Sequence, residues 1–272
     1  MKYYKKPRHK NIIFLQGDGE WGARLYPAKG ATVASAGCGL CSVTHASLER
    51  DMYADSTPLT WLEFMKKYAI VGNGTAWAGI PAGLKHIGMK DVKEFNGDMN
   101  GGSMKPFFDE LKKGKRIAIV LFQNPLRESG ETAVAGDGTI WTTGGHYVFF
   151  GGVRVNDGKM EFFCKDSSSR KNNGWKGYLK SMKGWIRIAW TARVPAEDIN
   201  LPDKGYFEKG DSSPEIKKIQ KFLKSQGLYR GLCRGNLKRW TRKAILKFQR
   251  KYNLKQDGKF GAECLRKYEE IA

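Results

Sequence analysis

Cys38 is the residue of this sequence whose surroundings most favour chemistry. It lies in Ala36-Gly37-Cys38-Gly39, just before an apolar periodic run over 43–48. Two flanking glycines allow a sharp turn into a helix. A thiol at a helix N-terminus meets unpaired N–H groups and the positive end of the helix dipole, which favour the thiolate and lower the cysteine pKa. The pattern therefore predicts a nucleophile. An inert buried cysteine is the alternative, and only partners elsewhere in the chain can decide between the two.

His146 and Asp166 are the best candidates for those partners. His146 begins an apolar strand and Asp166 ends the next one, with the hairpin turn Asn156-Asp157-Gly158 between them. Antiparallel hairpin strands place the start of one strand near the end of the other. Together with Cys38, these residues fit the spacing of a catalytic triad.

Other histidines and another cysteine allow different interpretations. His9 lies in a charged terminus and His86 on an amphipathic helix, while His45 follows Cys38 by seven positions, roughly 10 Å along one helix. Cys38, Cys41 and His45 could instead be zinc ligands, but no second cysteine pair lies nearby. A redox C-x-x-C is disfavoured because no buried strand is expected before it. The sequence thus predicts no metal site and no cofactor.

Gln16 is a candidate for holding negative charge. It ends a short strand expected over 12–16, and its side-chain amide offers two N–H donors that could help to stabilise an oxyanion beside a thiolate. An ordinary surface glutamine is the alternative.

The elements that must position these residues are predicted from periodicity and stop signals. Helices are expected from Cys38 to about Arg50, from Thr57-Pro58 to 69, over 80–87, and from Ser103 to Gly114. Strands are expected over 116–122, 144–153, 160–165 and 184–194, with a short helix over 176–183. Helices followed by antiparallel strands predict an α+β fold.

Composition indicates a folded and strongly basic protein. The 272 residues are 40% hydrophobic and carry 48 Lys and Arg against 27 Asp and Glu, a formal charge of +21. Residues 205–272 hold 18 basic and 7 acidic residues, so +11 of that charge lies there. This charge predicts attraction to an anionic polymer, for which nucleic acid, an acidic cell wall and an anionic membrane surface all qualify.

Cysteine usage and the N-terminus bear on localisation. Five scattered cysteines suggest no disulfide framework, and the apolar segment after the basic 1–10 region is too short for an export signal. No run is long enough to span a bilayer. We expect a protein made in the cytoplasm without a signal peptide, which acts on its target after release.

Residues 12–194 resemble the C39-like cysteine peptidases, which have a papain-type fold with a helical half and an antiparallel-sheet half. The shared motifs are Gln16, Trp21-Gly22, Ala36-Gly37-Cys38-Gly39, Gly145-His146-Tyr147-Val148 and Lys165-Asp166. The resemblance implies Cys38 as nucleophile, His146 as general base and acid, Asp166 as the residue that orients the histidine, and Gln16 as oxyanion donor. The chain departs from the family at Leu40, usually proline, and at Lys165, usually apolar.

The C-terminal part resembles a three-helix peptidoglycan-binding domain found in wall hydrolases. The shared motifs are Ile219-Gln220, Thr241-Arg242-Lys243-Ala244, Phe248-Gln249 and Asp257-Gly258-Lys259-Phe260-Gly261. The predicted organisation is a peptidase domain over 1–194, a linker over 195–204 and a binding domain over 205–272. Tyr229, Arg239 and Trp240 are the candidate binding residues, chosen as side chains expected to be exposed.

The sequence as a whole predicts a peptidoglycan hydrolase resembling phage endolysins. It would cleave an amide bond in the wall peptide, as an endopeptidase or an amidase, with the wall and its anionic polymers as partners. A cysteine peptidase that acts on a protein or leader peptide is one alternative. A noncatalytic nucleic-acid-binding protein is another, disfavoured because aromatic residues do not alternate with the basic ones.

Overall fold

The computed structural model describes residues 1–272 apart from 28–29, 51–52, 71–72, 100, 196–198 and 272. The described chain forms two compact units, Met1–Val194 and Pro195–Ala272, each with its own hydrophobic core. Part of the predicted linker, residues 196–198, lies outside the described residues.

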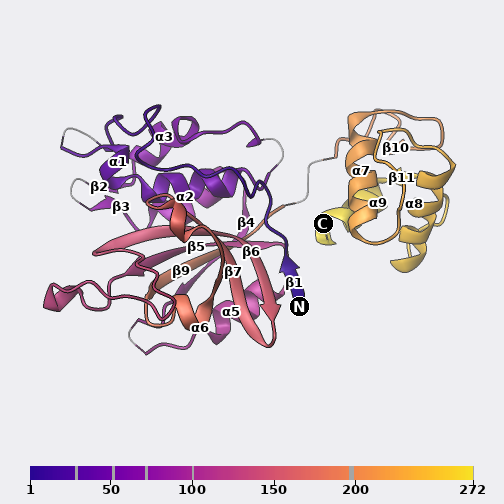
Figure 1. The fold of residues 1–272 in the computed structure, drawn as a ribbon. Helices are drawn as coiled ribbons and strands as arrows, with labels where there is room; N and C mark the ends of the chain where they lie inside the picture. The colour runs from indigo at the N-terminus through magenta and orange to yellow at the C-terminus, as the bar shows by residue number, and fades with distance from the viewer. Residues whose placement is uncertain (28–29, 51–52, 71–72, 100, 196–198, 272) are drawn as a thin grey trace. The chain divides into compact units, whose positions relative to one another are not determined.

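An antiparallel sheet forms the centre of the first unit (Figure 1). Its order is β4-β9-β5-β6-β7-β8, and β1 pairs with β6 outside this path. The strands are β1 (Lys2–Lys5), β4 (Lys90–Asn96), β5 (Arg116–Gln123), β6 (Gly145–Asn156), β7 (Lys159–Asp166), β8 (Gly174–Gly177) and β9 (Ile186–Arg193). The predicted mixed fold with an antiparallel sheet is therefore confirmed.

The β6–β7 hairpin turns where the sequence predicts it. Asp157 and Gly158 have φ values of 47° and 74°, the positive values that a two-residue type I′ turn requires. In the resulting register Val148 pairs with Asp166, which places the aspartate two residues from His146 along the neighbouring strand.

Helices cover one face of this sheet. They are α1 (Val33–Ala36), α2 (Cys38–Ser47), α3 (Pro58–Lys66) and α4 (Gly79–His86), accompanied by the short hairpin of β2 (Ala69–Ile70) and β3 (Gly74–Thr75). Residues 39–47 of α2 are all buried. Leu40 and Val43 share a core with Ile119 and Phe149 of the sheet, so α2 is fixed along its length and Cys38 is held at its start.

The opposite face of the sheet carries a second core. It lies beneath α5 (Lys105–Lys112) and α6 (Tyr178–Ser181), with short 3-10 turns η2 (Arg127–Ser129) and η3 (Arg170–Asn172) in the loops. Along β5, Ile119 faces the first core and Val120 the second. Burial on both faces explains why the sequence of β5 is a continuous apolar run without alternation.

The structure differs from the predicted elements at several places, since β1, β2, β3 and β8 were not predicted and the helix predicted to extend to 69 ends at Lys66. Two further differences have a clear physical reason. The strand predicted over 12–16 is wrong: this segment is irregular, because the Phe14 N–H donates to the His45 side chain at 3.0 Å and the Gln16 N–H to a single carbonyl, that of Ser167, at 2.9 Å. The polar β4 was not predicted. Its side chains are largely exposed, and it joins the sheet edge through pairing with β9.

The second unit is a small helical domain with one short β ladder. It contains β10 (Tyr206–Phe207), α7 (Pro214–Ser225), α8 (Arg239–Lys251), β11 (Phe260–Gly261) and α9 (Ala262–Ile271). The Ser213 hydroxyl caps α7 by accepting the Ile216 N–H at 3.2 Å. Ile219, Ile245 and Phe248 lie fully buried between the helices.

None of the helices in the described parts of the chain combines the length and the apolar character needed to cross a bilayer.

Candidate functional site

Cys38 is the first residue of α2 and is partly exposed, whereas the residues that follow it are buried. Neither flanking glycine is needed for a positive φ. A Cβ at Gly37 would lie 2.5 Å from the Val33 carbonyl oxygen, and one at Gly39 would lie 2.3 Å from the Thr75 hydroxyl. The glycines are therefore required by close packing around Cys38 rather than by the sharp turn that the sequence suggested.

The Cys38 sulfur contacts groups that favour its ionised form. Burial raises the pKa of the thiol. The hydrogen bond and charge of His146, together with the backbone N–H groups of Tyr147 and Gly39, outweigh this effect and lower the pKa below its usual value. These surroundings therefore favour the thiolate form of Cys38 at the N-terminus of α2.

His146 contacts both Cys38 and Asp166. The imidazole is 5% exposed, and its Nε2 lies 2.7 Å from Asp166 Oδ1, which leaves Nδ1 for the sulfur. Burial opposes protonation of the ring. The hydrogen bonds and charges of Asp166 and Cys38 prevail and raise the pKa of His146 to about 10. Both shifts act in the same direction, because they favour the thiolate–imidazolium pair over the neutral thiol and imidazole.

Asp166 is fully buried and accepts several hydrogen bonds. Asn172 Nδ2 donates to Oδ2 at 2.7 Å, and both the N–H and the hydroxyl of Ser168 donate to Oδ1 at 2.7 Å. Burial alone would raise the pKa of the carboxyl, but His146 and these donors lower it. Asn172 and Ser168 were not among the predicted site residues. Their signal in the sequence is the polar stretch 167–173 directly after the acid.

Gln16 is held near Asp166 by two hydrogen bonds of its side chain. Its Nε2 donates to the Ala34 carbonyl at 2.7 Å, and its Oε1 accepts the Ser167 hydroxyl at 3.2 Å. The side chain is thus fixed between α1, which precedes Cys38, and the residue after Asp166. One N–H of the amide remains for another acceptor. No direct hydrogen bond joins Gln16 to Cys38 among the residues described.

The other histidines and the cysteine that the sequence offered as alternative bases or zinc ligands have different surroundings. Burial lowers the pKa of His45 well below its ordinary value, and its Nε2 accepts the Phe14 N–H. Burial raises the pKa of the Cys41 thiol. His86 stacks on Phe64 with 3.7 Å between ring centroids. Within the described ranges, no three or more His, Cys, Asp or Glu side chains are grouped to hold a metal ion.

Lys165, the departure beside Asp166, is buried inside the first unit. Its Nζ donates to the His9 carbonyl at 2.9 Å. Burial is the main cause that lowers its pKa to about 8, helped by the charge of Lys5 and opposed by that of Glu49. The side chain therefore holds the N-terminal segment against β7.

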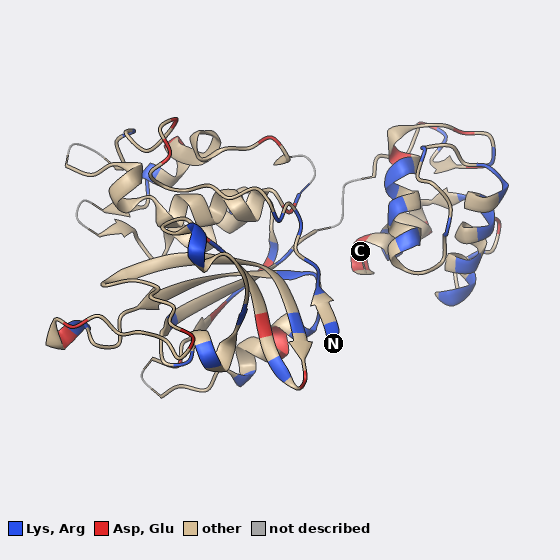
Figure 2. Cartoon of the chain, in the orientation of Figure 1, with Lys and Arg blue, Asp and Glu red and all other residues tan. Residues whose placement is uncertain are grey.

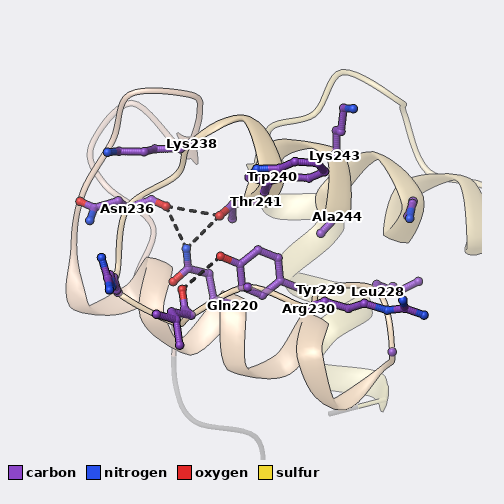
Figure 3. A pocket seen from close by; sticks show the side chains of 15 residues that line it. Gln220, Leu228, Tyr229, Arg230, Asn236, Lys238, Trp240, Thr241, Lys243 and Ala244 are labelled. Carbon is purple, nitrogen blue, oxygen red and sulfur yellow. Dashed lines mark hydrogen bonds between the residues drawn. The ribbon is translucent and has the colours of Figure 1, made fainter.

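A cleft of about 710 Å³ lies in the second unit (Figure 3). Two of the predicted binding residues, Tyr229 and Trp240, line it, and Arg239 is not among the lining residues. Trp240 is 69% exposed, as expected, but Tyr229 is only 9% exposed. The expectation that Tyr229 is a surface side chain is wrong, because its ring packs into the core and its hydroxyl donates to the Leu232 carbonyl at 3.1 Å.

Gln220 fixes the base of this cleft. Its Nε2 donates to the Asn236 carbonyl and to the Thr241 hydroxyl, both at 2.8 Å, and its Oε1 accepts the Gly235 N–H at 3.0 Å (Figure 3). This network ties α7 to the chain that enters α8.

Gln249 repeats the same arrangement one helix later. Its Oε1 accepts the Gly258 N–H, and its Nε2 donates to the Lys259 carbonyl, each at 2.9 Å, and to the Cys264 sulfur at 3.6 Å. Cys264 thus accepts from Gln249 as Thr241 accepts from Gln220.

Comparisons with solved structures give partial similarities. The N-terminal domain of SleB is 26% identical and covers 27% of this chain and 96% of its own, with a TM-score of 0.25. A structure described as a "putative C39-like peptidase from Bacillus anthracis" is 16% identical, covers 70% and 98%, and has a TM-score of 0.40. A peptidoglycan-binding protein from Clostridioides difficile is 15% identical, covers 57% and 92%, and has a TM-score of 0.24.

Sequence comparison is more specific for the second unit. No curated protein matches the chain. Residues 212–267 match the family described as "Putative peptidoglycan binding domain", which supports a partner in the bacterial cell wall.

Proposed function

We propose that this protein is a papain-like cysteine peptidase that cleaves an amide bond in the peptide part of peptidoglycan. The observation that carries the proposal is the Cys38–His146–Asp166 array, in which a partly exposed thiol meets a buried histidine–aspartate pair. It lies in the same chain as a segment that matches a peptidoglycan-binding family.

The proposed reaction starts from the thiolate–imidazolium pair. The Cys38 sulfur attacks the carbonyl carbon of the scissile amide, and the carbonyl oxygen becomes an oxyanion. The backbone N–H of Cys38 and the remaining amide N–H of Gln16 are the donors assigned to that oxygen. His146 then gives its proton to the leaving amine, the C–N bond breaks, and an acyl-enzyme remains.

Release of the acyl group uses the same residues in reverse. His146, now neutral, takes a proton from water as the water attacks the thioester, and the departing sulfur regains the thiolate. Asp166 remains ionised throughout, because Asn172 and Ser168 saturate its oxygens, and it keeps the imidazole oriented and stabilises its charged form. This chemistry is carried by side chains of the chain itself.

The second unit serves as the wall-binding part in this proposal. Binding to an insoluble polymer raises the local concentration of scissile bonds around the peptidase unit. The role is that of an endolysin-like enzyme, made in the cytoplasm and acting on the wall after release.

The direct test is loss of turbidity of purified bacterial walls. Cys38→Ala should abolish lysis, whereas Cys233→Ala, at a half-buried cysteine of the second unit, should retain it. EDTA should have no effect on the rate. Normal lysis by Cys38→Ala would refute the proposal.

Product analysis separates the alternatives. Mass spectrometry of solubilised material should show new amino and carboxyl termini on wall peptides, and their position tells an endopeptidase from an amidase. Clipped protein with intact wall peptides would instead favour a peptidase of protein or leader-peptide substrates.

A further inference from the structure

Positive side chains surround the cleft of the second unit. They are Arg230, Arg234, Lys238, Lys243 and Lys247, all of which line the cleft and are exposed. No acidic residue is among its described lining residues, and within the described chain none of the five forms an ion pair with a carboxylate. Figure 2 shows the same excess of Lys and Arg along α7 and α8. These charges are unneutralised, and so they are available to an anionic ligand.

Aromatic rings lie among these cations. Trp240 is 69% exposed, and Lys243 Nζ lies over its ring, 5.1 Å from the centroid. The Tyr229 ring forms part of the wall, with its hydroxyl already engaged by Leu232 (Figure 3). An exposed aromatic ring can pack against the C–H surface of a sugar or polyol. The cations around it attract singly charged anionic groups such as phosphodiesters.

The cleft is also preformed. The buried Gln220 satisfies both its oxygen and its amide within the base of the cleft, and Thr241 donates to the Asn236 carbonyl at 3.3 Å. A rigid base reduces the conformational entropy lost when a flexible polymer binds.

We propose that this cleft binds a flexible sugar- or polyol-phosphodiester polymer of the cell wall. This inference depends on the proposed function in one respect, which is that the protein acts at the cell wall. Five cations exceed the one or two carboxylates of a wall stem peptide, whereas a phosphodiester polymer offers one charge per repeat along the whole cleft. Nucleic acid carries the same charges, but Trp240 is the one exposed aromatic residue among the described residues that line the cleft, so stacking of successive bases is not supported.

The test measures binding of the full chain in a Cys38→Ala background, so that the wall is not degraded. The cleft variant combines Arg234→Ala, Lys243→Ala and Lys247→Ala. The matched control combines Lys209→Ala, Lys255→Ala and Arg266→Ala, which removes the same charge from exposed positions of the same unit outside the cleft.

The probes are soluble polyglycerol phosphate, purified walls before and after hydrofluoric acid removes phosphodiester polymers, and a single-stranded DNA with the same number of phosphates. The cleft variant should bind polyglycerol phosphate and untreated walls at least tenfold more weakly, and the control should bind like the parent. With about 0.7 ions released per contact, the slope of log K against log salt should decrease by about 2 in the cleft variant. Stripped walls should bind more weakly than untreated walls.

Three results would overturn the proposal. Equal binding to stripped and untreated walls would mean that the cleft takes peptidoglycan itself. DNA binding as tight as that of polyglycerol phosphate would indicate an unselective polyanion surface. Equal losses in the cleft and control variants would mean that net charge, rather than the cleft, drives binding. Hydrolysis is measured separately with native Cys38, so failure of the peptidase proposal is distinguishable from failure of this one.

Discussion

Replacing His146 with alanine should make Cys38 a slow nucleophile at mildly acidic pH. In the native protein His146 is the main cause that lowers the thiol pKa. Without it, burial raises the pKa and is opposed only by the backbone N–H groups of Tyr147 and Gly39, which are weaker causes. The pKa of Cys38 in the variant should therefore rise to about its ordinary value of 9.0.

The size of the effect follows from that value. At pH 6.5 a thiol with a pKa of 9.0 is ionised in about 1 molecule in 300. The native thiol can at most be fully ionised, so the loss of thiolate in the variant should slow alkylation by up to about 300-fold. The more basic thiolate of the variant is intrinsically more reactive, with a Brønsted coefficient of about 0.4, which reduces this loss without cancelling it. The difference should shrink as the pH approaches 9.0.

The rate of alkylation by iodoacetamide measures the reactivity of Cys38 without any substrate. Peptide mapping by mass spectrometry would give the rate at Cys38, and Cys233 in the same digest would serve as an internal standard. His9→Asn is the matched control, because asparagine tolerates the positive φ of 44° at that position and the site histidine is kept. A native alkylation rate at Cys38 in His146→Ala at pH 6.5 would refute the assigned electrostatics.

The remaining predictions concern the groups around this pair and the base of the cleft. The rate of lysis should decline above about pH 10, because His146 then loses its proton. It should also decline in acid, because the Cys38 thiolate is protonated below its lowered pKa. A pH–rate profile that lacks either the acid or the alkaline decline would contradict this assignment. Asn172→Ala removes a hydrogen bond to Asp166 and one cause of its lowered pKa, so it should raise the pKa of Asp166 and lower kcat about tenfold by loosening the carboxylate that orients His146, whereas an unchanged kcat would contradict this positioning role. Gln16→Ala should lower kcat by about 10²–10³ if its amide holds the oxyanion, with little change in KM; an unaltered kcat would remove it from the mechanism. Gln220→Ala leaves a buried N–H unpaired and should destabilise the second unit by about 2 kcal/mol, measured by denaturant unfolding, and unchanged stability would argue against the network.

Local sequence determined much of the architecture because the deciding interactions are local. The paired positive-φ residues of the β6–β7 turn and the Ser213 cap of α7 act within a few residues, so their effects can be read from the chain. The continuous apolar run of β5 likewise predicts a strand buried on both faces.

Tertiary structure decided where the pattern was ambiguous. The segment 12–16 is apolar enough for a strand, yet its backbone donates to His45 and Ser167 from distant parts of the chain. The polar β4 has no apolar alternation to reveal it, since it is stabilised as an edge strand by β9. Both outcomes depend on partners more than 30 residues away, which no local pattern contains.

The candidate site also has features that the sequence specifies and features that only the folded structure supplies. Residue types and spacing were sufficient to nominate Cys38, His146 and Asp166, because a hairpin register brings strand ends together. Only the folded chain supplies Asn172 on the buried carboxylate and the packing that requires glycine on both sides of the cysteine. It also buries Tyr229 and leaves Trp240 exposed in the cleft. The physical reason is that burial and desolvation, which set pKa values and exposure, arise from the whole three-dimensional packing, whereas the sequence alone specifies which groups are present.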